Sequence, residues 1–547
     1  MFSIDAIPDV RRFIMSNYSK FKDRNPQDTV LEIRSILDEI GLSPEFTWTE
    51  KSYEGARACR LSFPPTQTGV NGKGTDEEYS RASAYAELIE RMSNGILFVR
   101  DYNQICKSTD GFQEFPDERI ISIEDYIGSD DPVAGYLLPK LGIEDKQIQI
   151  EYLEELCREY GYADGTIALV PFADKLDNVI RWLPPMILHL VYGSNGMAAG
   201  NTLEEAMVQG LSEVFERAVT KEIVHGRVIP PQIPDEELKK YDFYHLIEQF
   251  RSQSHLEVQL FDCSLGKEWP VVGLCIKDRG KGTFGVRFGA HPSFAVAVER
   301  TLTEAFQGRS IEDFVSTCRS GTQEEADHFN NLPNIYKVGE GCYPAKLFTD
   351  DPGWMYKPWT RWNSHDNKGF LKEMLRLLKD SGFRPLIRDS SFLGFPCCYI
   401  VVPGLSETAP LCMLSAKEYL TAFKVKNSFG HFPNLSEEEE KRLFRMLKFK
   451  SKRYIENQIE YISSRYLSSE YNSELLARYL SLKYDVNYEN NKDILRKKYQ
   501  SVCCYDCVNC PIAGEQCITP AIMEILHKIR KFMRTENANQ EALLLQT

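Results

Sequence analysis

The sequence lacks long apolar runs and any excess of basic charge. No stretch approaches the roughly 18 consecutive apolar residues of a membrane-spanning helix, so we expect no membrane contact. The 79 Asp and Glu residues outnumber the 65 Lys and Arg residues, which gives a net charge of −14. Non-specific binding of nucleic acid needs a basic surface, so we expect no nucleic-acid partner.

A secretory signal is also missing. Residues 1–20 mix Asp5, Asp9, Arg11 and Arg12 with apolar residues, which does not fit the apolar segment of a signal peptide. We therefore expect a cytoplasmic protein. The 15 cysteines should be mostly reduced in that compartment, so a cluster of them indicates metal binding before disulfide bonding.

Neither of two common nucleotide-binding motifs is present in the context that its function requires. The sequence contains no G-x-x-x-x-G-K-[ST] motif, which excludes a P-loop. Its G-x-G-x-x-G match at 280–285 lies within a stretch that we expect to be sheet core and opens no helix, which excludes a Rossmann dinucleotide site. What it does contain is enough apolar material for a packed core. With 547 residues and 42% hydrophobic composition, we expect a globular protein of two or more domains.

The stretch 195–217 predicts a helix with one polar face. Asn201 or Thr202 can cap its start, and an apolar stripe follows at helical spacing. The polar face carries Glu205, Gln209, Glu213 and Glu216, which fall within about 80° of arc. Such a face is either simply solvated or neutralised by cations, and hard divalent cations prefer these oxygen ligands.

The same arrangement recurs twice, which favours a binding site. A helix after Gly72-Lys73-Gly74 carries Ser83, Glu87, Glu90 and Arg91 on one face. A helix after Gly289-Ala290-His291-Pro292 carries Arg300, Glu304 and Gln307. We interpret the three as one nucleotide site, in which loop amides and helix N-termini bind phosphate, carboxylates bind Mg²⁺, and Lys73 and the arginines offset phosphate charge.

The wider pattern predicts an α/β fold with mixed sheets and packed helices. Strand, Gly loop and helix follow one another at 57–93, 181–218 and 284–309, so the loops should converge at one sheet edge. We expect a helix over 29–40 that ends at Gly41, and sheet core within 255–288. Residues 101–165 are either an insertion that contacts a peptide or partner, or ordinary surface structure. We expect packing roles for Cys263, Cys275, Cys397, Cys398 and His291.

The stretches 72–91, 195–217 and 288–309 resemble the three ATP-binding motifs of the YcaO family. The resemblance continues through Ser264-Leu265-Gly266 and residues 402–406, and covers roughly residues 20–430. It implies the YcaO fold and its chemistry. Members use ATP and Mg²⁺ to phosphorylate a peptide backbone amide oxygen after a nucleophile has added to the carbonyl, giving an azoline, an amidine or a thioamide.

The resemblance also implies roles for individual residues. The Mg²⁺ ligands would be Glu87, Glu90, Glu205, Glu213 and Glu216. The nucleotide would be held by Lys22, Thr29, Ser83, Asn201, Gln209, Arg217 and Gln307. The residue pattern itself adds Lys73, Arg91, Arg300 and Glu304 to the ATP site. No catalytic residue is predicted.

The sequence changes character near residue 430. We expect an ATP-binding YcaO domain over 1–430 and a helical C-terminal domain over 431–547. The second part contains a cysteine cluster: Cys503, Cys504, Cys507, Cys510 and Cys517. Its spacing favours metal, either a structural Zn²⁺ or an iron–sulfur cluster, and thiols that relay sulfur are a third reading.

Three functions stay open. The chain has no proline after Pro520, whereas azoline-forming members of the family end in a Pro-rich tail, so thioamide formation or another thiolation-type modification is favoured over cyclodehydration. The chain could instead be an ATP-binding accessory protein for a methylthiotransferase of ribosomal protein S12. A ligase that forms an acyl phosphate has little support. The expected partners are a peptide or protein substrate, a protein for substrate recognition or sulfur delivery, and a second copy in a homodimer.

Overall fold

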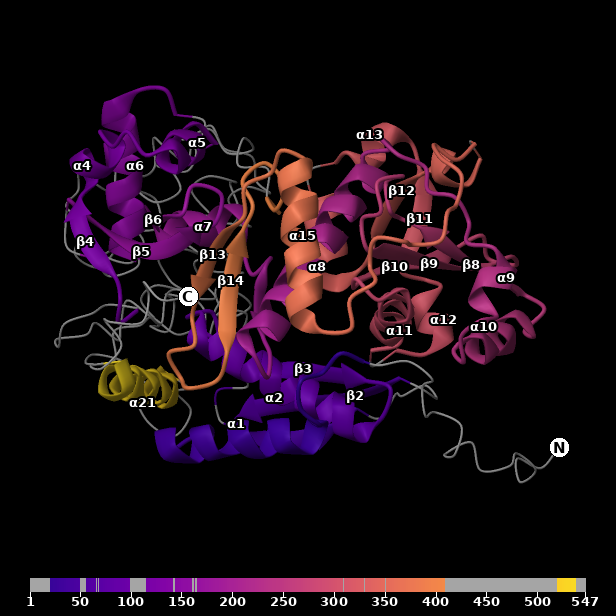
Figure 1. The fold of residues 1–547 in the computed structure, drawn as a ribbon, viewed down its shortest axis with the longest axis horizontal. Helices are drawn as coiled ribbons and strands as arrows, with labels where there is room; N and C mark the ends of the chain where they lie inside the picture. The colour runs from indigo at the N-terminus through magenta and orange to yellow at the C-terminus, as the bar shows by residue number, and fades with distance from the viewer. Residues whose placement is uncertain are drawn as a thin grey trace, which may run out of the picture.

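In the computed structural model, the described residues form three β-sheets with helices packed between and around them (Figure 1). It describes residues 20–49, 56–98, 115–408 and 519–537, with gaps at 65, 67, 141–142, 160–161, 163–164, 308, 329 and 350. The predicted mixed α/β architecture is confirmed. Among the described residues, no helix is long and apolar enough to cross a membrane.

The N-terminal layer is a three-stranded antiparallel sheet with two helices. Its elements are α1 (Pro26–Ile40), β1 (Glu45–Trp48), β2 (Arg57–Phe63), β3 (Thr68–Gly74) and α2 (Glu77–Ser93). The side chain of Asn25 caps α1, and Gly41 ends it in a left-handed conformation at φ +78°. The predicted helix over 29–40 is confirmed, and so is a strand at the start of 57–93.

The second sheet has the strand order β12-β11-β10-β9-β8. Its strands are β8 (Leu256–Asp262), β9 (Val271–Asp278), β10 (Phe284–Ala290), β11 (Cys318–Gly321) and β12 (Gly341–Pro344). The associated helices are α9 (Asp235–Leu238), α10 (Tyr244–Arg251), α11 (Phe294–Ala305), α12 (Ile311–Phe314), α13 (Gln323–Ala326), α14 (Asn331–Val338) and η2 (Ala345–Phe348). All neighbouring strands are antiparallel except β11 and β12. The sheet core expected within 255–288 is confirmed.

The third sheet has the order β4-β5-β13-β14-β7, with β6 paired to β5. Its strands are β4 (Arg119–Ser122), β5 (Thr166–Asp174), β6 (Val179–Leu183), β7 (Met197–Ala199), β13 (Leu386–Asp389) and β14 (Cys397–Val401). The helices around it are α4 (Ile123–Ile127), α5 (Pro132–Lys140), α6 (Lys146–Glu159), α7 (Pro185–Val191) and α15 (Asn367–Asp380).

Helix α8 (Leu203–Val224) lies between the second and third sheets (Figure 1). It contacts β7 and β14 on one side and β9 and β10 on the other. Leu211, Val214, Phe215 and Val219 on it are fully buried. Because apolar packing covers most of its circumference, the polar face is the part of α8 that remains for a cavity.

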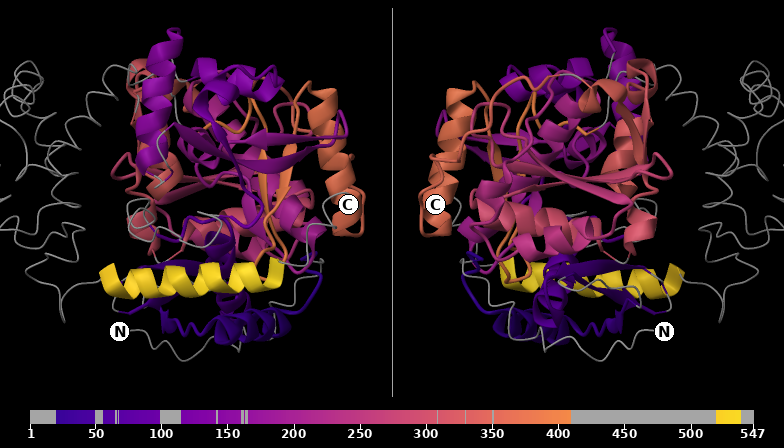
Figure 2. Two further views of the ribbon diagram at one scale, coloured as in Figure 1. Left: turned by 90° about the vertical axis from the view of Figure 1, so that its left-hand side faces the viewer. Right: turned by 90° about the vertical axis from the view of Figure 1, so that its right-hand side faces the viewer.

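Helix α21 (Thr519–Asn537) comes from the predicted C-terminal domain and packs on the N-terminal layer (Figure 2). Its buried residues Ile522, Ile525, Ile529 and Met533 belong to the same hydrophobic cluster as the core of α1. Helical structure is thus present in this part of the chain. The predicted domain boundary near 430 and the cysteine cluster lie outside the described residues.

The glycines that we predicted in phosphate-binding loops lie in or beside strands, so this prediction is wrong. Gly72 and Gly74 belong to β3, and Gly289 belongs to β10. A Cβ at Gly72 would stand 2.1 Å from the carbonyl oxygen of Ser80, and one at Gly289 would stand 2.6 Å from that of Ala297. These glycines let a strand approach the backbone of the helix that follows it.

Substitution of Gly72 tests this close packing. We expect Gly72→Ala to lower the free energy of unfolding by about 1–3 kcal/mol, because the methyl group must push β3 away from α2. Gly135→Ala is the matched control, since a Cβ at this helical position meets nothing within 4 Å, and it should stabilise by about 0.5–1 kcal/mol. Urea denaturation measures both. Equal effects of the two substitutions would show that the contact is unimportant.

Candidate functional site

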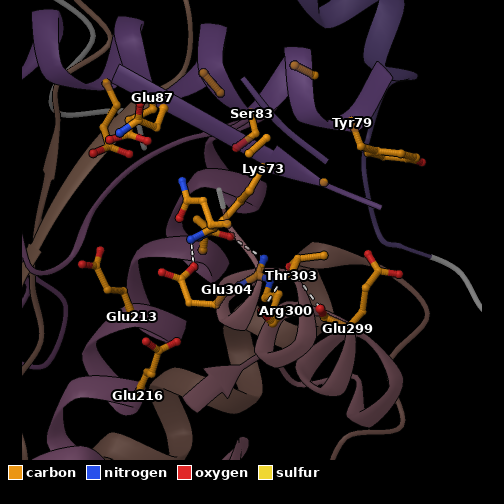
Figure 3. Close-up of a pocket in the computed structure, with 18 of the residues that line it drawn as sticks. Lys73, Tyr79, Ser83, Glu87, Glu213, Glu216, Glu299, Arg300, Thr303 and Glu304 are labelled. Carbon is orange, nitrogen blue, oxygen red and sulfur yellow. Dashed lines mark hydrogen bonds and ion pairs between the residues drawn. The ribbon is translucent and has the colours of Figure 1, made fainter. Parts of the chain in front are cut away.

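A cavity of about 840 Å³ is lined by α2, α8 and α11, the strands β3 and β10, and the N-terminal segment (Figure 3). Every residue that the sequence predicted for ATP or Mg²⁺ lines it. From the N-terminal layer and the segment before it come Lys22, Thr29, Lys73, Ser83, Glu87, Glu90 and Arg91. From α8, α11 and their flanks come Asn201, Glu205, Gln209, Glu213, Glu216, Arg217, Arg300, Glu304 and Gln307. The helix-face pattern therefore located one site from separate stretches of sequence.

One end of the cavity carries a cluster of carboxylates from α2 and α8 (Figure 3). Its members are Glu87, Glu90, Glu213 and Glu216. Arg91 lies 3.5 Å from Glu87 and 3.6 Å from Glu90, and Arg217 lies 2.5 Å from Glu213. Each arginine is one turn or less from its partner on the same helix, so these pairs partly offset the local negative charge.

The charge of this cluster is not fully compensated. Burial, together with the neighbouring carboxylates Glu87 and Glu213, raises the pKa of Glu90 to about 8, although Arg91 acts in the opposite direction. Burial likewise raises the pKa of Glu216 to about 7, although Lys73 acts in the opposite direction. A divalent cation here would lower both pKa values, because it favours the ionised carboxylates.

The middle of the cavity holds two cations. Lys73 on β3 forms an ion pair with Glu304 on α11. Arg300 on α11 donates to the carbonyl oxygen of Ala290 at 2.9 Å and to the side-chain oxygen of Gln209. Burial lowers the pKa of Lys73 and lowers that of Arg300 to about 10. An anionic ligand at this point would relieve the cost of enclosing both charges.

The N-terminal segment is attached to the start of α8 through Glu205. The carboxylate of Glu205 accepts from Lys22 at 3.0 Å and from the backbone N–H of Asp23 at 2.9 Å. Asn201 donates to the same carboxylate, and Thr29 donates to Asn201 at 2.6 Å. Burial opposes ionisation of Glu205, but Lys22 and these hydrogen bonds outweigh it and lower its pKa.

Sequence reasoning missed a group at the opposite end from the carboxylates. Lys20 forms an ion pair with Glu299 at 3.2 Å, donates to Thr75 at 2.6 Å and lies over the ring of Tyr79. Figure 3 shows Tyr79 and Glu299 on this side of the cavity. The Lys20-x-Lys22 spacing in a polar stretch was the available signal, but only the fold brings it to α2 and α11.

Residues expected to pack are buried as predicted. Cys263, Cys275, Cys397 and Cys398 are all 3% exposed or less. His291 is 2% exposed, its Nδ1 accepts from the backbone N–H of Ser293, and its ring stacks on Phe21. Burial, with the charges of Arg300 and Lys22 nearby, lowers the pKa of His291 well below its usual value. A structural role for this neutral histidine follows.

The possible metal ligands among the described residues do not form a compact ligand group. No three His, Cys, Asp or Glu side chains of that part of the chain are close enough together to share one ion. The cavity's carboxylates nevertheless provide oxygen donors only, from two facing helices, which is the donor type that suits Mg²⁺. The zinc or iron–sulfur site predicted at Cys503, Cys504, Cys507, Cys510 and Cys517 lies outside the described residues.

Residues 71–406 match the family model of the YcaO cyclodehydratase domain, which is described as ATP- and Mg²⁺-binding. The chain belongs to the YcaO family. The matched range begins in β3 and ends just after β14, so it includes α2, α8 and α11 with the carboxylate cluster. The matched range thus contains most of the cavity lining, while Lys20, Lys22, Thr29 and other lining residues precede it.

Two curated proteins show the level of similarity within the YcaO family. The chain is 30% identical over 400 residues to the ribosomal protein S12 methylthiotransferase accessory factor YcaO of Escherichia coli. It is also 30% identical over 395 residues to an uncharacterized protein of Haemophilus influenzae. Each alignment covers 71% of this chain and 66% of the relative, so the chain spans slightly less than two thirds of the length of these relatives.

Solved YcaO-type structures are more distant. A heterocyclase in complex with substrate and cofactor is 18% identical, with a TM-score of 0.48 over 72% of this chain and 55% of that one. The YcaO protein of Methanopyrus kandleri, bound with AMPPCP and Mg²⁺, is 19% identical, with a TM-score of 0.41 over 70% of this chain and 92% of that one.

The raised pKa of Glu90 predicts a pH dependence of stability. In EDTA, the folded protein keeps this proton to about pH 8, whereas an unfolded chain loses it near the ordinary value of 4.5. The folded state therefore binds more protons in this window, and stability falls as pH rises through it. Glu90→Gln should remove this loss of stability. At pH 8 the free energy of unfolding of the variant should exceed that of the wild type by on the order of a few kcal/mol, whereas at pH 4.5 it should not.

Urea denaturation at the two pH values measures the difference between the variant and the wild type. The exposed Glu39 on α1 provides the control, since Glu39→Gln should leave the pH dependence unchanged. A Glu90→Gln protein that is no more stable than the wild type at pH 8 would contradict the assigned burial cost.

Proposed function

We propose that this chain uses Mg²⁺ and ATP to activate a backbone amide of a peptide or protein by O-phosphorylation, for thioamide formation or another thiolation-type modification. The observation that carries the proposal is the single cavity in which a four-carboxylate cluster adjoins Lys73 and Arg300. Family membership supports the same choice, because the YcaO domain is described as binding ATP and Mg²⁺.

Amide activation explains why such a site would be needed. The oxygen of an amide is a poor leaving group, and phosphorylation makes it a good one. In the proposed reaction, the sulfur of a sulfide donor bonds to the amide carbon and the amide oxygen accepts the γ-phosphoryl group of ATP, leaving ADP. The carbon–oxygen bond then breaks, phosphate leaves with the oxygen, a proton passes to solvent, and a carbon–sulfur double bond remains. The protein contributes mainly positioning and charge compensation.

We assign residues by their place in the cavity. Glu87, Glu90, Glu213 and Glu216 would supply oxygens to Mg²⁺, with at most two of them reaching any one ion in the described arrangement. Lys73 and Arg300 would offset phosphate charge. The nucleotide would be held by Lys22, Thr29, Ser83, Arg91, Asn201, Gln209, Arg217, Glu304 and Gln307. Glu205 was predicted as a further Mg²⁺ ligand. Because both of its oxygens already accept hydrogen bonds, we assign it to anchoring the N-terminal segment.

Sulfur enters the proposal through the E. coli relative, whose name associates it with a methylthiotransferase of ribosomal protein S12. The same name supports a second candidate, in which this chain binds ATP as an accessory protein and forms no product of its own. Azoline formation is a third, supported by the cyclodehydratase description of the family. A partner for substrate recognition or sulfur delivery, a homodimer and a cytoplasmic location stay predictions.

Removal of one carboxylate tests the nucleotide site. We expect Glu213→Ala and Glu87→Ala each to abolish Mg²⁺-dependent ATP binding, because each deletes an oxygen donor of the cluster, while the melting temperature without ligand changes little. Glu222→Ala on the same helix is the matched control, since Glu222 pairs with Arg227 away from the cavity. Isothermal titration with ATP measures binding. Wild-type affinity in both cavity variants would refute the shared site.

Product analysis separates the candidate functions. With ribosomal protein S12 of the same organism as the first probe, together with sulfide and Mg-ATP, we expect ADP release that depends on S12 and a mass gain corresponding to replacement of oxygen by sulfur. Loss of water instead would identify cyclodehydration. ATP binding without ADP release or modified S12, under conditions that include the methylthiotransferase, would favour the accessory role.

A further inference from the structure

Three basic residues form one part of the cavity wall that contains no carboxylate. They are Arg287 on β10, Arg309 after α11 and Lys337 on α14, and we call them the basic wall. All three line the same cavity as the carboxylate cluster. They were not predicted as site residues from the sequence, because they come from separate elements that only the fold brings together.

Most other cations of the cavity have a carboxylate partner. Lys20, Lys22, Lys73, Arg91 and Arg217 each lie within 4 Å of one. Their charges are therefore largely balanced inside the protein. Arg287 and Lys337 have no such partner among the described residues, and Arg309 has only a long ion pair with Glu340, at 4.0 Å. This difference is the first indication that an external anion balances the basic wall.

Arg287 is held in place without an acidic partner. Its Nη1 donates to the carbonyl oxygens of Val286 and Gly339, both at 2.7 Å. Gly339 has a φ of +68°, and a Cβ there would stand 2.1 Å from the Arg287 guanidinium. The absent side chain at Gly339 thus leaves the space that the guanidinium fills. Burial, with the like charge of Arg309 nearby, lowers the pKa of Arg287.

Arg309 and Lys337 are also poorly compensated. Arg309 donates to the carbonyl oxygen of Val338 at 2.8 Å, and its ion pair with the exposed Glu340 is long, at 4.0 Å. Its Nη1 is buried and has no hydrogen-bond partner among the described residues. Lys337 is exposed and pairs with no residue in the part of the chain that the structure describes. A buried, unsatisfied N–H of a guanidinium is costly unless a ligand accepts from it.

The basic wall lies beside the carboxylate end of the cavity. Tyr336, which precedes Lys337 on α14, donates from its hydroxyl to the carbonyl oxygen of Arg217 at 2.7 Å. Arg217 in turn pairs with Glu213 in the cluster. Lys337 and Val338 are exposed, so this wall is also reached from solvent. A chain entering here would meet the basic wall next to the place where we assign Mg²⁺.

We propose that the basic wall binds a carboxylate of the peptide substrate, an Asp or Glu side chain close to the amide that is modified. The inference rests on the proposed function and adds a substrate class to it. The planar, forked guanidinium suits a carboxylate. A phosphate of Mg-ATP fits the basic wall less well. The Mg²⁺ bound to that phosphate needs carboxylate ligands, which the neighbouring cluster has and the basic wall lacks.

A random heptapeptide library displayed on phage, selected in the presence of Mg²⁺ and a non-hydrolysable ATP analogue, tests the inference. Wild-type protein should enrich Asp and Glu at one position of the selected peptides. For a selected acidic peptide, Arg309→Gln should weaken binding about tenfold, and Arg309→Lys should recover part of the loss. Replacing the enriched Asp or Glu of the peptide by its amide should weaken binding to the wild-type protein as much as Arg309→Gln does. The same replacement should leave binding of the peptide to the Arg309→Gln protein unchanged.

Controls separate this inference from the proposed function. Arg319→Gln, which removes an exposed arginine paired with Glu325 outside the cavity, should behave as wild type. Lys337→Gln should lose less affinity for the acidic peptide than Arg309→Gln. It is the variant to test if Arg309→Gln does not fold. Wild-type protein that binds Mg-ATP but shows no acidic preference would overturn the basic wall's assignment alone. Loss of nucleotide affinity in Arg309→Gln would also overturn it, by assigning the wall to phosphate. Failure of the wild type to bind Mg-ATP would overturn both proposals.

Discussion

Compensation of charge inside one cavity is the constraint on which the rest of the site depends. Seven glutamates, several cations and their hydrogen-bond partners line it together, and an unpaired charge costs far more there than it does in water. The protein meets this cost with ion pairs such as Lys73–Glu304 and Lys22–Glu205. What remains uncompensated is informative. Burial makes Glu90 and Glu216 hard to ionise and Arg300 costly to keep charged, and the basic wall has no close carboxylate partner, so the cavity suits a cation and anions together.

Packing of the backbone brings these charges to one place. Helix α8 is covered by two sheets, so its Glu-bearing face is the side left for the cavity. Glycines at the ends of β3 and β10 allow α2 and α11 to follow their strands closely, which fixes the direction in which their polar faces point. The N-terminal segment, held by Glu205, completes the wall. Apolar burial and close backbone contact therefore position side chains that would otherwise repel one another.

Much of this site could be predicted from the sequence because it is built on helices. Helical periodicity places Glu205, Gln209, Glu213 and Glu216 on one face whatever the surroundings, and the same holds for α2 and α11. Features that depend on tertiary contacts could not be predicted in this way. The glycines resembled phosphate loops, whereas they serve strand–helix contact. Arg287 and Arg309 were in no predicted set of site residues, and their lack of a close carboxylate partner becomes visible only when the fold brings β10 and α14 together.

The most direct test of the shared cation and nucleotide site is a crystal structure with Mn²⁺ and a non-hydrolysable ATP analogue, in which anomalous scattering locates the metal. We predict a Mn²⁺ peak between α2 and α8, bound by oxygens of the Glu87, Glu90, Glu213 and Glu216 cluster, with phosphates next to Lys73 and Arg300. Mn²⁺ and phosphates located outside this cavity would contradict the central claim.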